Sequence, residues 1–495
     1  MLKLFKGLML AYTQNIVKVL TALFFTPFLL QSVGMAQFGI FTLAAAVSSY
    51  LLFLDSGLKT TFTRFFLKED HNLNQLSVLI NSLFLSTLFG LLIFFAGFIL
   101  LLNIDVFLNS SFDNNLEQIK SIIFFYSLSA GFVIFMTPFS GILIAQERFI
   151  AIQFIEIGTL IISTIISVIY LLNGYGIVEI SLIAAFAAVI QMLIKSVLAI
   201  NYLSAGKIHL NIQLNIILEM VGFLIPIAFA FFAYLLFWRT DYFVLGALSA
   251  PSILALYGIG IFFNKHLESI SSAVSKILMP RIIKKIDSGI TGSELNLMLI
   301  NISRLQLLIL APIIFSLFIL GDNFIELWLG EDFKKSYILM IILVAAYAFE
   351  LIGWSRNTIM QVYGIYYIRS IFLFLFAAIN LMASFLIFDS YGLEGVVLIT
   401  GVSILLNYIS VSITMSLVLK MNFFEYSMNV FGRVILIMLS IMSLYIFIMQ
   451  FSTSIFSEIS IGILFIIIFI VFLLIYGVRD DEKKVIRKII SGKAK

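Results

Sequence analysis

Ionisable side chains stand in the middle of a segment that is otherwise apolar enough to cross a membrane. The segment starts after Pro251, and Lys265, His266 and Glu268 lie near its centre. A charge at such a depth costs at least about 2.5–3.5 kcal/mol per residue on insertion scales. A lysine binds phosphate as a point charge, and a glutamate can exchange a proton. The segment therefore indicates anion binding or proton exchange in a wet interior, with an internal Lys265–Glu268 ion pair as the structural alternative.

Helical periodicity gathers the polar residues of this segment on one side. They run along almost its whole length: Tyr257, Asn264, Lys265, Glu268, Ser271, Ser272 and Ser275. We therefore expect this face to look into a polar cavity.

Further ionisable residues occur inside or beside other apolar segments. The cations that could meet an anionic group, besides Lys265, are Lys18, Arg304, Arg356, Lys59 and Arg64. The acids that could exchange a coupling ion, besides Glu268, are Glu156, Asp55, Glu219 and Glu350. Each has a simpler alternative, because cations near helix ends snorkel or fix the topology and acids at the boundary can be ordinary edge residues.

The composition defines the class of protein. The chain has 495 residues, of which 62% are hydrophobic and 11% are charged, with a mean hydropathy of +1.14. A soluble protein carries about 25% charged residues. The lack of alternating period-two segments favours transmembrane helices. The absence of cysteine excludes disulfides, and three histidines give no basis for a metal centre. We expect no cofactor, no metal and no nucleic-acid partner.

Apolar windows of about 20 residues predict fourteen transmembrane helices. They cover residues 9–31, 38–57, 76–102, 119–145, 150–172, 177–200, 216–238, 250–277, 297–320, 337–355, 369–388, 393–419, 432–451 and 459–477. The distribution of Lys and Arg predicts a multi-pass protein with both termini in the cytoplasm.

Two pairs of short matches indicate an internal repeat. Tyr175–Gly176 and Tyr391–Gly392 are 216 residues apart, and Phe38–Gly39 and Tyr257–Gly258 are 219 apart. Six spans per repeat favour parallel repeats with a site at their interface. We therefore expect an all-α fold with two pseudo-symmetric six-helix lobes around a central cavity, followed by two appended helices. The predicted parts are residues 1–210, 211–420 and 421–478, and a basic cytoplasmic tail at 479–495.

Short motifs occur in a fixed order between residues 30 and 420. They are Gly34, Phe38–Gly39, Asp55–Leu58 and Arg64, then Thr240–Gly246, Gly321–Gly330 and Tyr391–Gly395. The ordered set resembles Wzx-type polysaccharide flippases of the MATE-like exporter (MOP) superfamily, in which the motifs at 240–246 and 321–330 form turns. The resemblance implies alternating-access transfer of an undecaprenyl-diphosphate-linked oligosaccharide, such as an O-antigen or capsule precursor. Transfer would run from the inner to the outer leaflet of a bacterial cytoplasmic membrane.

The source of energy follows from what the sequence lacks. No G-x-x-x-x-G-K-[ST] motif occurs, so we expect coupling to H⁺ or Na⁺. The implied partners are the prenyl-diphosphate-linked glycan, membrane lipids, and a polysaccharide polymerase and glycosyltransferases. A MATE-type antiporter of small molecules is the main alternative. An enzyme such as a membrane-embedded polymerase is less favoured, because the external loops at 103–118 and 321–336 are short and contain no His.

Overall fold

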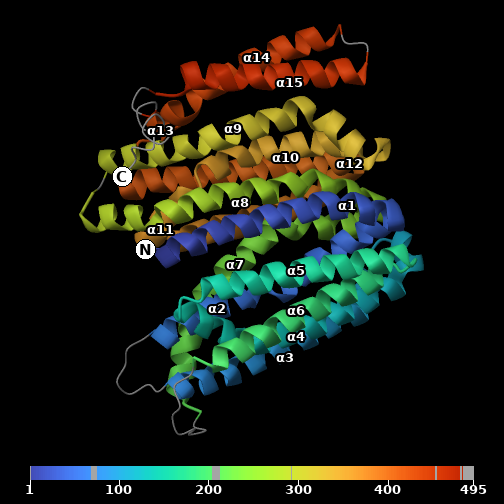
Figure 1. The fold of residues 1–495 in the computed structure, drawn as a ribbon, viewed down its shortest axis with the longest axis vertical. Helices are drawn as coiled ribbons and strands as arrows, with labels where there is room; N and C mark the ends of the chain where they lie inside the picture. The colour runs from blue at the N-terminus through green and yellow to red at the C-terminus, as the bar shows by residue number, and fades with distance from the viewer. Residues whose placement is uncertain are drawn as a thin grey trace. The chain divides into compact units, whose positions relative to one another are not determined.

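A computed structural model describes residues 2–67, 75–202, 212–290, 292–451, 454–479 and 482, and these residues are almost wholly helical, with no strand among them (Figure 1). The all-α class is therefore confirmed. Apart from Arg479 and Glu482, the predicted basic tail lies outside the described residues. The α-helices are α1 (Leu2–Leu51), α2 (Phe53–Leu67), α3 (Gln75–Phe107), α4 (Leu116–Ala145), α5 (Phe149–Leu172), α6 (Ile177–Ile200), α7 (Leu214–Leu248), α8 (Pro251–Asp287), α9 (Ser293–Leu329), α10 (Lys335–Ile352), α11 (Ser355–Val362), α12 (Tyr366–Leu419), α13 (Phe423–Ser427), α14 (Arg433–Met449) and α15 (Ile455–Phe472).

Within the described residues, eleven helical segments are long and apolar enough to cross a membrane. The segment Thr13–Leu67 covers most of the first predicted span and all of the second, and α12 contains the eleventh and twelfth. Helix α8 has 37 residues but is not among the eleven, because the polar and charged residues around Lys265 lower its hydropathy. The chain is thus a multi-pass membrane protein, and the number fourteen stays a prediction.

Two glycines interrupt the helical backbone inside α1 and α12, so each of these segments consists of two helices joined at a kink. Gly34 inside α1 has φ +79°, and Gly392 inside α12 has φ +56°. Backbone with positive φ costs little only for glycine, which has no Cβ. Gly34 lies between the first and second predicted spans and Gly392 between the eleventh and twelfth, so the kinks separate the members of each pair.

Two predicted turns are helical instead. Residues 240–246 lie inside α7, and residues 321–329 form the end of α9, which Gly330 follows. The glycines of these motifs allow close packing: a Cβ on Gly321 would lie 2.6 Å from the Met340 Cε atom, and one on Gly246 would lie 3.3 Å from Leu108 Cδ2. The prediction of turns at these motifs is therefore wrong.

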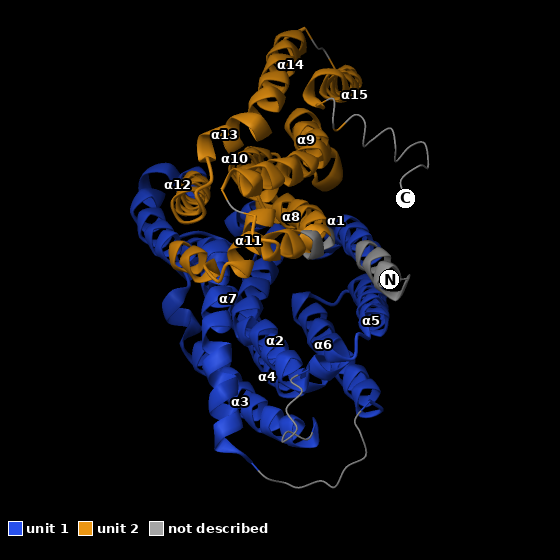
Figure 2. Ribbon diagram, turned by 90° about the vertical axis from the view of Figure 1, so that its left-hand side faces the viewer, with its two compact units in different colours: residues 1–258, 373–396 blue, residues 259–372, 397–495 orange. Residues whose placement is uncertain are grey.

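The helices form two compact units. Unit 1 comprises residues 1–258 and 373–396, and unit 2 comprises residues 259–372 and 397–495 (Figure 2). In unit 1, α4 packs against α2, α3 and α6, while α5 packs against α1 and α6. In unit 2, α9 packs against α10 and α15. The boundaries of the predicted lobes stay a prediction.

The aromatic–glycine motifs of the predicted repeat meet within unit 1. A Cβ on Gly39 of α1 would lie 1.7 Å from the carbonyl oxygen of Pro251, at the start of α8. A Cβ on Gly258 of α8 would in turn lie 3.1 Å from Thr42 Cγ2 of α1. Each glycine thus lets the other's helix approach closely. These contacts do not test the repeat, which stays a prediction.

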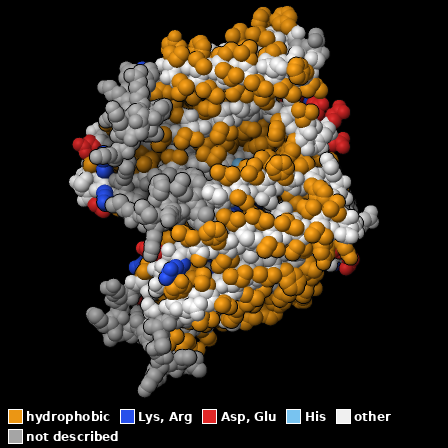
Figure 3. All heavy atoms as spheres, in the orientation of Figure 1, with side chains coloured by type: hydrophobic (Ala, Val, Ile, Leu, Met, Phe, Trp, Pro, Cys, Tyr) orange, Lys and Arg blue, Asp and Glu red, His pale blue; other side chains and the backbone are white. Residues whose placement is uncertain are grey.

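The outer faces of the helices carry large apolar side chains that are exposed, among them Phe24, Leu386 and Phe456. In Figure 3, hydrophobic side chains cover much of the visible face and charged side chains are few. A soluble protein rarely exposes apolar area of this extent. Such a surface suits contact with lipid.

Candidate binding site

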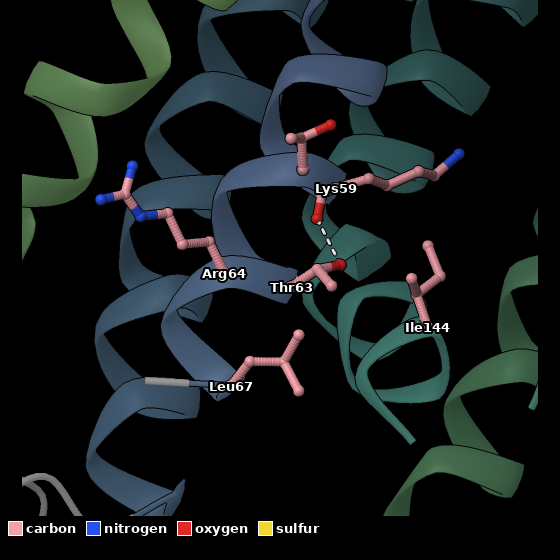
Figure 4. Close-up of a pocket in the computed structure, with 6 residues that line it drawn as sticks. Lys59, Thr63, Arg64, Leu67 and Ile144 are labelled. Carbon is pink, nitrogen blue, oxygen red and sulfur yellow. Dashed lines mark hydrogen bonds between the residues drawn. The ribbon is translucent and has the colours of Figure 1, made fainter. Parts of the chain in front are cut away.

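A cavity of about 600 Å³ lies beside α2 in unit 1. Its lining residues are Lys59, Thr60, Thr63, Arg64, Leu67 and Ile144. In Figure 4 the Thr63 hydroxyl donates a 2.7 Å hydrogen bond to the carbonyl oxygen of Lys59, and the Lys59 and Arg64 side chains point away from one another. The cavity therefore offers two separate cations and two threonine hydroxyls.

Both cations are held by neighbouring side chains. Lys59 forms an ion pair with Asp55, one helical turn earlier on α2, where the i,i+4 spacing brings the two side chains together. The Thr137 hydroxyl of α4 donates a 2.7 Å hydrogen bond to the other oxygen of Asp55. The guanidinium of Arg64 lies 4.1 Å from the ring centroid of Phe223 on α7. Three helices thus position the charges at this cavity.

A second ion pair in unit 1 joins three helices. Lys195 of α6 donates to Glu156 Oε1 of α5 at 2.9 Å, and Gln14 of α1 donates to Glu156 Oε2 at 2.6 Å. Lys195 also donates to Gln191 at 3.3 Å. The Lys195 side chain is 3% exposed, whereas that of Glu156 is 29% exposed. A buried ammonium therefore meets a carboxylate that is partly open to the surroundings.

The two ion pairs belong to one electrostatic neighbourhood. Glu156 is attracted by the exposed Lys18, and Lys195 interacts electrostatically with both Lys59 and Asp55. The structure thus brings together four residues expected from the sequence and one that was missed, Lys195. The available signal was its position inside the span 177–200, one turn after Gln191.

Tyr257 also lies in unit 1, in a buried polar network. Its hydroxyl donates to Asp241 Oδ2 of α7 at 2.6 Å, and Asn380 of α12 donates to Asp241 Oδ1 at 3.2 Å. Ser384 donates to Asn380 Oδ1 at 2.9 Å. These four residues are buried. Asp241 was not among the expected site residues, because it lies close to the predicted end of span seven.

Much of the predicted polar face of α8 packs within unit 2. Ser271 donates to the carbonyl oxygen of Leu351 on α10, and Ser275 shares a 2.8 Å hydrogen bond with Ser355 of α11. Gln306 of α9 donates to Ser271 at 2.9 Å and to Ser275 at 3.1 Å. These hydroxyls therefore bind neighbouring helices.

The central residues of α8 have different surroundings. Lys265 is exposed, while Glu268 is half-buried and accepts a 2.9 Å hydrogen bond from Tyr347 of α10. Asn264 is buried, and neither atom of its side-chain amide has a hydrogen-bond partner. Glu219, on α7 of unit 1, is exposed. The roles expected for Lys265, Glu268, Asn264 and Glu219 stay predictions.

The expected arginines of unit 2 are buried among protein groups. Arg356 and Arg369 both pair with Glu350, at 3.4 and 3.0 Å, and all three side chains are at most 5% exposed. Arg356 also donates to Ser412 and stacks on Tyr408, with 4.2 Å from its Cζ to the ring centroid. A substrate contact for Arg356 stays a prediction.

Arg304 has a comparable environment in unit 2. It pairs with Glu482 and donates to the carbonyl oxygens of Gly477 at 2.6 Å and Asn429 at 3.0 Å. Its side chain is 1% exposed. These bonds tie α9 to the segments around α13 and α15, and a substrate role for Arg304 stays a prediction.

Comparison with known proteins gives one family and a set of related folds. The sequence profile of a family described as polysaccharide biosynthesis protein matches residues 33–338. No curated protein sequence matches the chain significantly. The solved structure of the lipid II flippase MurJ in an inward closed conformation is similar, with a TM-score of 0.65, 15% identity, and 94% of this chain and 97% of that chain covered.

Two multidrug transporters are also similar. The MATE multidrug transporter DinF-BH gives a TM-score of 0.60 and 15% identity, covering 86% of this chain and 96% of its own. An inward-facing multidrug resistance MATE family transporter of the MOP superfamily gives 0.55 and 16% identity, covering 82% and 94%. At such identities the likeness shows the fold, which this chain shares with MurJ and the MATE transporters.

Proposed function

This chain belongs to the polysaccharide biosynthesis protein family, and we propose that it is a flippase for an undecaprenyl-diphosphate-linked oligosaccharide. It would move this lipid from the inner to the outer leaflet of a bacterial cytoplasmic membrane. The likeness to a lipid II flippase supports a substrate that is itself a lipid with a large polar headgroup. A polysaccharide family supports a glycan in that headgroup.

The cavity beside α2 is the observation that carries this proposal. A lipid diphosphate needs cations for its phosphates and hydrogen-bonding groups for its sugars on the way past hydrocarbon. Lys59 and Arg64 provide the cations, and Thr60 and Thr63 provide hydroxyls, in a unit that exposes many large apolar side chains. Lysine attracts phosphate as a point charge and arginine can bind it through two N–H groups.

A MATE-type antiporter of small molecules is the second candidate, because two of the similar folds are multidrug transporters. A cavity for organic cations would favour acidic groups in its wall. The residues that line the described cavity include two cations and no acid. The lining therefore favours an anionic substrate.

The combined substitution Lys59→Gln and Arg64→Gln tests the proposal. In a strain that lacks the gene, the double variant should restore less than about a tenth of the surface polysaccharide restored by the unaltered protein, since tenfold corresponds to about 1.4 kcal/mol of lost binding. Arg148→Gln is the matched control, because Arg148 is an exposed cation of the same unit that stacks on Tyr202. Full restoration by the double variant would reject the cavity.

Coupling to H⁺ or Na⁺ is a further part of the proposal. Glu268 and Asp241 support it best, because both accept hydrogen bonds from tyrosine hydroxyls, those of Tyr347 and Tyr257. An acid in such a place can exchange a cation as access alternates between the two sides. In proteoliposomes, Glu268→Gln or Asp241→Asn should make transport insensitive to an imposed pH or sodium gradient. A retained response in both would assign coupling elsewhere.

A further inference from the structure

We propose that Lys195 is a phosphate-binding residue, and that the Glu156 carboxylate occupies the position of the phosphate on it until the substrate arrives. This inference rests on the proposed function, because it assumes an anionic lipid as substrate. It concerns a residue outside the lining of the cavity beside α2, and it gives Glu156 a role other than ion coupling.

The geometry of the pair allows such an exchange. The Lys195 ammonium is buried and needs a negative partner, because an unpaired charge in a low-dielectric interior is strongly unfavourable. The partner is a carboxylate oxygen at 2.9 Å, the kind of contact that a phosphate oxygen would also make. Glu156 is about ten times more exposed than Lys195, at 29% against 3%. The carboxylate therefore has room to leave, while the ammonium stays in place.

The surroundings of the pair connect it to the cavity. Lys195 interacts electrostatically with Lys59, which lines the cavity, and Lys18 attracts Glu156 from its exposed position. Lys59 is itself ion-paired with Asp55, so Lys59 and Lys195 each have a carboxylate of the protein as counter-ion. With Lys18, three lysines face two carboxylates, which leaves one net positive charge. An arriving diphosphate would compensate that charge and replace a carboxylate as the counter-ion.

The side chains suit a partner that changes. A lysine ammonium is a point charge with three rotatable donors, so it can pass from a carboxylate to a phosphate without realignment of a rigid fork. Gln14 donates to the Glu156 oxygen that Lys195 does not bind, at 2.6 Å. In this exchange the Glu156 carboxylate competes with the phosphate of the substrate for the Lys195 ammonium. It would weaken binding and assist release, and its removal would do the reverse.

Glu156→Gln tests the exchange by direct binding. The full chain in nanodiscs is titrated with undecaprenyl diphosphate, and with undecaprenol as the phosphate-free probe. We expect Glu156→Gln to bind undecaprenyl diphosphate about tenfold more tightly, and Lys195→Met about tenfold more weakly, than the unaltered protein. Flipping by Glu156→Gln should show a lower KM together with a lower kcat. Glu117→Gln, which removes an exposed carboxylate at the start of α4, should change none of these values.

The outcomes separate the two proposals. If the unaltered protein binds undecaprenyl diphosphate no better than undecaprenol, the proposed function fails. If it prefers the diphosphate but Glu156→Gln binds it equally or more weakly, the exchange is overturned and the pair is a fixed brace. Glu156→Asp serves if the glutamine variant does not fold, because the shorter side chain loosens the pair while keeping its charge. Unchanged affinity for the diphosphate in Glu156→Asp would also overturn the exchange.

Discussion

Unit 1 and unit 2 each contain an acid with cations packed around it, but the cation differs. In unit 1 the acid is Glu156, partly exposed, and its close cation is Lys195. In unit 2 the acid is Glu350, buried, and its cations are Arg356 and Arg369. Both groups are made from side chains of several helices.

The difference in cation indicates a difference in task. Arg356 uses its planar group for bonds to Glu350, Ser412 and the Gly353 carbonyl oxygen, a set that fixes its position. Lys195 donates to two side chains, those of Glu156 and Gln191, and its ammonium is a point charge without a rigid fork that must match them. The arginine cluster therefore fastens α10, α11 and α12 together. The lysine pair can change its partner.

Glu350→Gln should have the largest effect, because it removes the acid between two buried arginines. Breaking a buried ion pair from one side costs about 3–5 kcal/mol. We expect little folded protein, measured by the recovery of a monodisperse peak in size-exclusion chromatography and by the thermal unfolding temperature. The control is Glu331→Gln, at an exposed position of the same unit. Normal recovery of Glu350→Gln would show that the cluster does not fasten unit 2.

Exchange of arginine for lysine in unit 2, and of lysine for arginine in unit 1, should have intermediate and unequal effects on stability. Arg356→Lys keeps the charge but loses hydrogen bonds of a buried guanidinium, which costs about 1–3 kcal/mol. Lys59→Arg keeps the charge at a half-buried position where the lysine acts as a point charge. The unfolding temperature of this variant should therefore stay near that of the unaltered protein. Equal losses in the two variants, measured by thermal unfolding in the same detergent, would remove the distinction between the units.

Lys195→Met should have the smallest effect on stability. The methionine fills the buried space of the lysine, and the freed Glu156 is exposed enough to be hydrated, so we expect a change within about 1 kcal/mol. Transport, in contrast, should fall about tenfold if Lys195 holds phosphate. Thermal unfolding and a flipping assay on the same preparation measure both. A large loss of stability would show that the Lys195–Glu156 pair holds helices together, as the arginine cluster of unit 2 does.

The fold was predictable to the extent that hydrophobic periodicity determines it. Long apolar windows identified the helices, because a backbone in lipid must satisfy its hydrogen bonds internally. The turns at Gly246 and Gly321 were mispredicted, because a glycine that lets a neighbouring helix approach and a glycine that ends a helix look alike in sequence. Only the packing partners, such as Met340 beside Gly321, distinguish them.

The parts of the site that depend on residues of a single helix could be predicted from the sequence. The Asp55–Lys59 spacing of four residues already places the two side chains together on one helix. Lys195 and Glu156 lie 39 residues apart on different helices, and their contact depends on the rotation of each helix about its axis. The polar face of α8 was read as one surface. Its hydroxyls at Ser271 and Ser275 instead bind α9, α10 and α11, because polar groups on adjacent membrane helices satisfy one another.

The central claim is transfer of an anionic lipid-linked glycan, and reconstitution tests it most directly. Proteoliposomes containing the full chain are loaded with a fluorescent glycan on undecaprenyl diphosphate, or with the same glycan on a phosphate-free undecaprenyl lipid. Quenching of the outward-facing label gives the transfer rate. We predict rapid transfer of the diphosphate-linked glycan, slow transfer of the phosphate-free one, and loss of rapid transfer with Lys59→Gln and Arg64→Gln together. Transfer of the diphosphate-linked glycan no faster than in protein-free vesicles would contradict the account.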